Sequence, residues 1–168
     1  MTMTDPDLRH VALRVTTTST EGTRAFAAAL APSAQAGDRL ALVGPLGAGK
    51  TQFAKGFAVG LGIDDVVNSP SFTLMAEYEG RLTLFHQDLY RLEGADEVFA
   101  GGLLDERQDD GVTLSEWADR HDEGLDPARL TVAIEPTGAD TRDIEISGHG
   151  EVAHRYVEAA RAWQEATA

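Results

Sequence analysis

The sequence has no cysteine, only two lysines, and no apolar run approaching the length of a membrane span. Without cysteine the chain forms no disulfide and no thiolate metal site, which is compatible with a cytoplasmic protein. A membrane helix needs about 20 apolar residues in succession, so we expect no membrane contact. The acidic start of the chain lacks the apolar core of a secretory signal. We therefore predict a cytoplasmic location and expect residues 1–9 to be flexible.

Positive charge is scarce as well. The chain has 14 lysines and arginines against 28 aspartates and glutamates, and its net charge is −14. Proteins that grip nucleic acid draw most of their affinity from basic side chains that neutralise phosphates. Because the chain has no basic stripe, we expect any role with RNA to be indirect, through a protein partner. Solubility is an equally good explanation of the acid excess.

One segment carries a strong chemical signal. Residues Gly44–Thr51 match the phosphate-binding pattern G-x-x-x-x-G-K-[ST], and they follow the apolar run Leu40–Val43. Phe53, Phe57 and Leu61 then repeat at helical spacing. A glycine-rich turn between a strand and a helix directs backbone N–H groups at one point, where an anion can bind. The pattern predicts a nucleotide site formed by Gly44, Leu46, Gly47, Ala48, Gly49, Lys50, Thr51 and Gln52.

Two side chains of this loop have specific predicted tasks. Lys50 would reach the β- and γ-phosphates of the nucleotide, and the Thr51 hydroxyl would ligate magnesium. A carboxylate normally completes such a magnesium shell. Asp88, Glu116 and Glu135 each follow an apolar strand, and position at the strand end alone does not choose among them. Glu135 ranks last because Pro136 follows it in what we predict to be a turn.

The rest of the chain alternates between strand and helix patterns. We predict strands over residues 10–15, 39–43, 72–78, 81–86, 112–114, 130–135 and 143–146. We predict helices over residues 20–35, from the loop to about residue 62, and over residues 95–104 and 150–165. Ser19 or Thr20 is the expected N-cap of the first helix. The dipeptide Glu79-Gly80 predicts a tight hairpin.

This order of elements predicts an α/β fold. We expect residues 1–168 to form a single domain, a three-layer sandwich like that of P-loop NTPases. Its mixed, mostly parallel central sheet would include the β-hairpin, and ligands would bind at the carboxyl ends of the strands.

Three further motifs, taken with the loop, make the chain resemble the TsaE (YjeE) family. They are Asn68–Phe72, His86–Leu92 (His-Gln-Asp-Leu-Tyr-Arg-Leu) and Ser115–Ala118, and the resemblance extends from about Thr20 to Arg142. Members of that family are small bacterial P-loop ATPases required to make N6-threonylcarbamoyladenosine at position 37 of tRNA (t6A37).

The resemblance implies a Mg²⁺-dependent ATPase with particular site residues. Thr51 and Glu116 would ligate magnesium, and Asp88 would be the Walker B-type acid that supports hydrolysis. Together with Lys50, Asp88 and Glu116 would form the catalytic set. Residues near Thr20 and Thr23, together with Arg142, would contact the adenine side of ATP.

The resemblance also implies how the ATPase would work. Residues 68–72 would act as a switch that senses the γ-phosphate. The partner would be the TsaD–TsaB complex, which transfers the threonylcarbamoyl group to tRNA. Hydrolysis would be slow for the protein alone and faster with the partner.

Two residues depart from the family pattern. Gln52 stands where members often carry a second threonine, so this chain lacks that hydroxyl. Gln87 stands where phenylalanine is common, which predicts a less buried face. We expect His86 to be a structural residue that orients the Asp88 turn. For Arg91 the alternatives are a transition-state contact and a salt bridge, and for Trp117 they are a nucleotide or partner contact and a place in the core.

Other functions remain open from sequence. A small-molecule kinase normally has a lid rich in arginine, whereas the arginines that follow the loop here are scattered. A GTPase is disfavoured because Asn68, the only asparagine, is not in an N-K-x-D motif. A nucleotide-gated binding module without hydrolysis is the third alternative, although the retained Lys50, Thr51 and acids argue against it.

Overall fold

The computed structural model describes residues 10–45, 47–64, 67, 75–88, 106–117 and 130–168. Within them the strands are β1 (His10–Thr17), β2 (Arg39–Val43), β3 (Met75–Tyr78), β4 (Thr83–Asp88), β5 (Gly111–Trp117), β6 (Leu130–Pro136) and β7 (Arg142–His149). The helices are α1 (Thr20–Leu30), α2 (Lys50–Gly60) and α4 (Gly150–Thr167), with 3₁₀ turns at Ala31–Ser33 and Glu106–Asp110. The expectations for residues 1–9, the switch loop at 68–72 and the helix at 95–104 lie outside the described residues.

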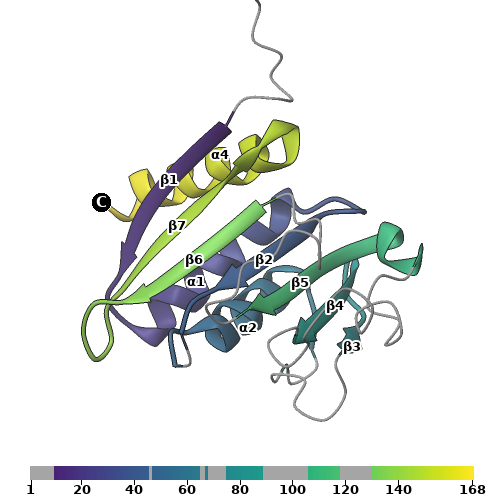
Figure 1. The fold of residues 1–168 in the computed structure, drawn as a ribbon, viewed down its shortest axis with the longest axis horizontal. Coiled ribbons are helices and arrows are strands. Elements are labelled where there is room, and N and C mark those ends of the chain that lie inside the picture. Colours follow the sequence, from purple (N-terminus) through teal and green to yellow (C-terminus); the bar gives the residue numbers. More distant parts are fainter. Residues whose placement is uncertain (1–9, 46, 65–66, 68–74, 89–105, 118–129) are drawn as a thin grey trace, which may run out of the picture.

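The seven strands form one mixed sheet in the order β1-β7-β6-β2-β5-β4-β3. The four middle strands, β6, β2, β5 and β4, are parallel, whereas β1, β7 and β3 join antiparallel at the two sides. The predicted mixed α/β sheet is therefore confirmed, with its parallel part confined to the middle. The carboxyl ends of the parallel strands all point to the same edge, toward the lower left of Figure 1.

All three described helices cover the same face of the sheet, behind it in Figure 1, with α1 packed between α2 and α4. The burial pattern agrees with this arrangement. Along β6, Leu130, Val132 and Ile134 are buried and the residues between them are less so, as expected for a strand covered mainly on one face. Strands β4 and β5 are instead buried on both faces over residues 84–87 and 111–116. The described residues account for two layers of the predicted three-layer sandwich. None of the described helices is long and apolar enough to cross a membrane.

Helix α1 begins where the sequence predicts and ends earlier. The Ser19 side chain accepts a hydrogen bond from the Gly22 N–H at 2.9 Å, as expected for an N-cap. The α-helix stops at Leu30 and continues as a 3₁₀ turn that contains Pro32. Proline has no N–H and its ring clashes with the preceding helical turn, so the predicted helix to Gln35 was too long.

The hairpin is also looser than predicted. Strand β3 pairs with β4 in the register Met75 to Gln87, but β4 begins only at Thr83, so residues 79–82 join the strands. Arg81 explains the longer connection. Its N–H donates to Leu61 O at 2.7 Å, and its guanidinium donates to the carbonyl oxygens of Ala31 and Ala34. These bonds hold residue 81 on the helix layer and keep it out of the strand.

Helices α1 and α2 pack backbone against backbone through two glycines of α2. A Cβ atom added to Gly56 would collide with Arg24 O, and one added to Gly60 would lie 2.5 Å from the Ala31 Cβ. The helices run in the same direction, since Arg24 meets Gly56 and Ala31 meets Gly60 further along both. The amino-terminal ends of α1 and α2 therefore lie at the same end of the helix layer.

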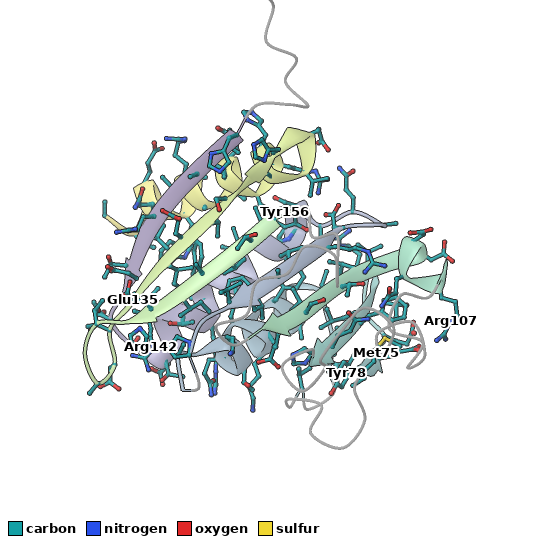
Figure 2. All side chains as sticks on the ribbon, in the orientation of Figure 1. Met75, Tyr78, Arg107, Glu135, Arg142 and Tyr156 are labelled. Carbon is teal, nitrogen blue, oxygen red and sulfur yellow. The ribbon has the colours of Figure 1, made fainter. Side chains whose placement is uncertain are left out.

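A buried ion pair ties α4 to the start of β2. Asp38 is 3% exposed, and its carboxylate accepts hydrogen bonds from the Arg155 guanidinium at 2.7 and 3.2 Å. The same carboxylate accepts from the Tyr156 hydroxyl at 2.6 Å and from the Gln35 N–H at 2.9 Å. Burial, reinforced by the Asp38 charge, raises the pKa of the Tyr156 phenol well above its usual range. In Figure 2, Tyr156 lies near the end of the sheet opposite to Arg142.

Candidate functional site at the glycine-rich loop

The glycine-rich loop leaves β2 after Val43 and enters α2 at Lys50, so the predicted strand–loop–helix order is present. Its backbone lies directly against β6, because a Cβ atom on Gly44 would approach Ile134 O to 2.5 Å. Gly49, the N-cap of α2, has a φ of 111°, in a region that favours glycine. Glycine is therefore favoured at position 44 because the backbone of β6 leaves no room for a side chain. It is favoured at position 49 because other residues adopt that positive φ only at a cost.

The start of α2 is electrostatically positive. The first N–H groups of a helix have no acceptor within the helix, and the helix dipole adds partial positive charge there. The first turn of α2 contains no acidic residue, and Gly49 provides no side-chain cap. The Lys50 Nζ donates to Gly44 O at 2.7 Å, which places the ammonium over the loop. An anion at this point would meet backbone donors and a cation together.

Arg142 joins the loop to the turn between β6 and β7. Its Nε donates to Ala48 O at 2.7 Å and one terminal nitrogen donates to Gly47 O at 3.4 Å. The other terminal nitrogen donates to Thr141 O at 2.8 Å. Figure 2 shows Arg142 at the edge of the sheet where the parallel strands end. The guanidinium thus braces the loop and adds a second positive charge beside it.

A small cleft opens next to Arg142. Its lining consists of Thr20, Thr23, Gly49, Gln52, Asp140 and Arg142. Five of these six are residues for which sequence predicted nucleotide contact. Asp140 was missed because it lies in the turn after β6 and belongs to no motif. The Thr23 hydroxyl is also hydrogen-bonded to the Thr17 hydroxyl, at 2.7 Å.

Gln52 has a partner that the sequence did not reveal. The Arg24 Nε donates to the Gln52 Oε1 at 2.7 Å, from α1 to α2. The Gln52 side chain, which lines the cleft, is therefore held by a guanidinium from the neighbouring helix.

Glu116 and Asp88 lie opposite each other in the register of neighbouring strands. In the parallel register Asp88 lies opposite Glu116, and Glu116 lies opposite Leu42, next to the start of the loop. The Glu116 carboxylate is almost fully buried, and its Oε2 is 2.7 Å from the His86 Nε2. His86 therefore contacts Glu116 across the strands. The Asp88 side chain lies outside the described residues, so its predicted link to His86 stays a prediction.

The prediction that Gln87 marks a less buried face is wrong. Gln87 is fully buried, and its Oε1 accepts from the Ser115 hydroxyl at 3.0 Å. Its amide nitrogen also contacts the Met75 sulfur at 3.6 Å. A buried polar side chain is tolerated where hydrogen bonds satisfy it, and the neighbouring strand supplies one here.

The remaining predicted residues divide into two groups. Leu46, residues 68–72, Arg91 and the Trp117 side chain lie outside the described residues. Glu135 is exposed at the end of β6, opposite Asp143. The part of the chain that the structure describes contains no cluster of three or more histidine, cysteine, aspartate or glutamate side chains able to hold a metal. Magnesium bound to a nucleotide needs only one or two protein oxygens, since phosphates and water complete its shell.

The fold and the site define a mixed α/β protein with a glycine-rich, positively charged loop at the carboxyl edge of a parallel sheet. Residues 17–144 match the family described as threonylcarbamoyl adenosine biosynthesis protein TsaE, and the chain belongs to this family. The tRNA threonylcarbamoyladenosine biosynthesis protein TsaE of Bacillus subtilis is 45% identical over 82% of this chain and 87% of its own. The protein of that name from Treponema pallidum is 35% identical over 80% of this chain and all of its own.

A solved structure is similar as well. The crystal structure of YdiB from Bacillus subtilis superposes with a TM-score of 0.68 at 37% identity, covering 95% of this chain and 99% of that one. The resemblance found from four short motifs is thereby confirmed at the level of the family and of the fold.

Proposed function

We propose that the protein is a Mg²⁺-dependent ATPase that serves t6A37 biosynthesis by acting on the TsaD–TsaB complex through a nucleotide-dependent switch. The observation that carries the proposal is the convergence at one edge of the sheet of the α2 amino terminus, Lys50, Arg142 and Glu116. Membership of a family of t6A biosynthesis proteins supports the pathway. The proposed contact with tRNA is indirect, through the partner complex.

The phosphates would bind in the loop. The backbone N–H groups from Gly47 to Thr51 and the Lys50 ammonium would hold them, with Lys50 exchanging its bond to Gly44 O for phosphate oxygens. The cleft next to the loop would take the nucleoside, with Thr20, Thr23, Gln52 and Arg142 around it. In this proposal the loop holds the phosphates and the cleft contacts the nucleoside, so the two together would select a whole nucleotide.

The residues near the loop also fit a magnesium ion. Thr51 in the first turn of α2 and Glu116 at the end of β5 would supply its protein oxygens, and Asp88 would support hydrolysis from the end of β4. A bound magnesium ion neutralises phosphate charge that develops during phosphoryl transfer. Oxygen donors from a hydroxyl and a carboxylate are the ligand types that magnesium prefers.

The test compares two lysine variants of the full chain. Lys50→Ala should weaken binding of a fluorescent ATP analogue about 10- to 100-fold, the scale of a lost charged hydrogen bond. Lys55→Ala, which removes the only other lysine in the chain from the same helix, is the matched control and should leave the affinity unchanged. Equal affinity of both variants and wild type would contradict phosphate binding by this loop.

The second part of the test separates the alternatives. ATP hydrolysis and t6A formation are measured with the protein alone and with the TsaD–TsaB complex. Slow hydrolysis that the complex accelerates, lost in Lys50→Ala, supports the proposal. Tight nucleotide binding with no hydrolysis under either condition would instead indicate the gated binding module. Phosphate transfer to a small molecule would indicate a kinase.

A further inference from the structure

We propose that His86 is a positioning residue that holds the carboxylate of Glu116 in place for magnesium. This inference rests on the proposed function, since it concerns the site at which the nucleotide-bound magnesium would lie. It starts from a contact that the sequence did not predict, the 2.7 Å approach of the His86 Nε2 to the Glu116 Oε2.

The strand register explains how the two side chains meet. His86 on β4 lies opposite Leu114 on β5, and Glu116 follows two residues later on the same face of the sheet. The 2.7 Å contact shows that the two side chains reach each other diagonally across the parallel strands. Both side chains are almost completely shielded from solvent, at 0% and 6% exposure. The imidazole therefore meets the carboxylate in a setting where water does not compete for the bond.

The chemistry of the pair assigns the donor. A carboxylate can only accept, so the Nε2 of His86 carries the hydrogen. The opposite ring nitrogen, Nδ1, is buried and has no hydrogen-bond partner among the described residues. The bond to Glu116 is therefore the one side-chain hydrogen bond that the imidazole makes among the described residues.

The surroundings of His86 argue against a purely structural role. Leu84 precedes it on the same face of β4, and Leu114 faces it from β5, and both are completely buried. An apolar side chain would suit such neighbours better, because it would leave no buried nitrogen unpaired. A histidine at this position is explained by the bond that its Nε2 makes. That bond restrains the Glu116 side chain next to the loop, as outer partners of metal-ligating carboxylates commonly do.

The experiment titrates Mg²⁺ and measures the affinity of the protein for a fluorescent ATP analogue. The Mg²⁺ midpoint is the Mg²⁺ concentration at which half of the gain in affinity is reached. His86→Leu should raise this concentration about 10-fold, the low end for loss of an outer partner, while the affinity measured in EDTA stays unchanged. His86→Gln, whose amide nitrogen can take the place of Nε2, should restore a value near wild type. An unchanged Mg²⁺ midpoint in His86→Leu would overturn the inference.

A matched control breaks the equivalent bond on the opposite face of the same strands. Ser115→Ala removes the hydroxyl that donates to Gln87, so it also weakens the contact between β4 and β5, but on the face of the sheet opposite to the Glu116 side chain. It should leave the Mg²⁺ midpoint unchanged. An equal shift in Ser115→Ala and His86→Leu would mean that strand pairing alone matters, and would overturn the positioning role.

Two further variants keep the test decisive. If His86→Leu does not fold, His86→Asn replaces it, because its amide is too short to reach Glu116, and it should behave as His86→Leu does. In the Glu116→Gln background, His86→Leu should cause no additional shift, and an additive shift would contradict coupling of the pair. If wild type itself shows no Mg²⁺ effect on nucleotide binding, the proposed magnesium site fails, whereas a wild-type effect that His86→Leu retains sinks only the role of His86.

Discussion

Asp38 and Glu116 are two buried acids at opposite ends of the parallel sheet, and their surroundings differ. Asp38 lies before β2, where Arg155, Tyr156 and a backbone N–H fill its oxygens. Glu116 lies near the end of β5, beside the glycine-rich loop, and bonds to an imidazole. Ligands of open α/β sheets bind at the carboxyl ends of the strands. We therefore expect the acid at the amino end to stabilise the fold and the acid at the carboxyl end to serve the proposed magnesium site.

The largest expected effect is on stability, at the amino end. Asp38→Ala leaves the Arg155 guanidinium and the Tyr156 hydroxyl without their acceptor. We expect a loss of about 3 kcal/mol, the low end for breaking a buried ion pair, because the Arg155 side chain is 15% exposed. Urea denaturation measures this loss, and nucleotide affinity of the folded variant should not change. If Asp38→Ala folds normally but binds nucleotide more weakly, Asp38 also affects the nucleotide site, and the contrast between the two acids is wrong.

A smaller effect of the opposite kind is expected at the carboxyl end. Glu116→Gln keeps an oxygen that can accept from His86 but removes the negative charge. We expect the Mg²⁺ midpoint for ATP binding to rise at least about 10-fold, and the free energy of unfolding to change by less than about 1 kcal/mol. Titration of Mg²⁺ and urea denaturation of the same preparation provide both numbers. A variant that binds Mg²⁺–ATP normally but is strongly destabilised would make Glu116 a second structural acid.

The smallest expected effect is on how stability depends on pH, through Tyr156 beside Asp38. The raised pKa of Tyr156 in the native state favours its neutral form, whereas an unfolded tyrosine ionises near pH 10. The stabilisation that results is fully present below about pH 10 and is lost as the pH rises above it. Tyr156→Phe should cost about 1 kcal/mol at pH 7, and its stability should fall less steeply above pH 10 than that of wild type. Parallel curves for the two proteins would contradict the account.

The loop could be predicted from sequence because its chemistry is local. Glycines at fixed spacing after an apolar run already specify a turn with close backbone approach, and the structure places that turn between β2 and α2. The early end of α1 was also readable in principle, since Pro32 lies within the predicted helix. The long connection before β4 was not readable, because it depends on Arg81 binding carbonyls about 50 residues away in the chain.

The contacts around Glu116 could not be predicted for a similar reason. The strands β4 and β5 are far apart in sequence, and only their register brings His86 and Glu116 to one face and Gln87 and Ser115 to the other. From sequence alone, a polar residue in a strand is predicted to be exposed unless its hydrogen-bond partner is known. The burial of Gln87 was therefore predicted wrongly. Asp140 was missed because a turn residue without a motif carries no signal of the cleft that it lines.

The two glycines between α1 and α2 give the helix layer a mechanical property. Gly60 lies at the far end of α2 from the loop, about 15 Å from Lys50 at 1.5 Å per residue. A side chain at Gly60 would collide with residues 28–31 and push the end of α2 away from them. If α2 tilts by about 4° in response, its other end, at Lys50, moves by about 1 Å. Displacements of that size are enough to spoil a site built on precise positions. The close contact of Gly60 with the end of α1 therefore helps to position the glycine-rich loop, although it lies at the other end of α2.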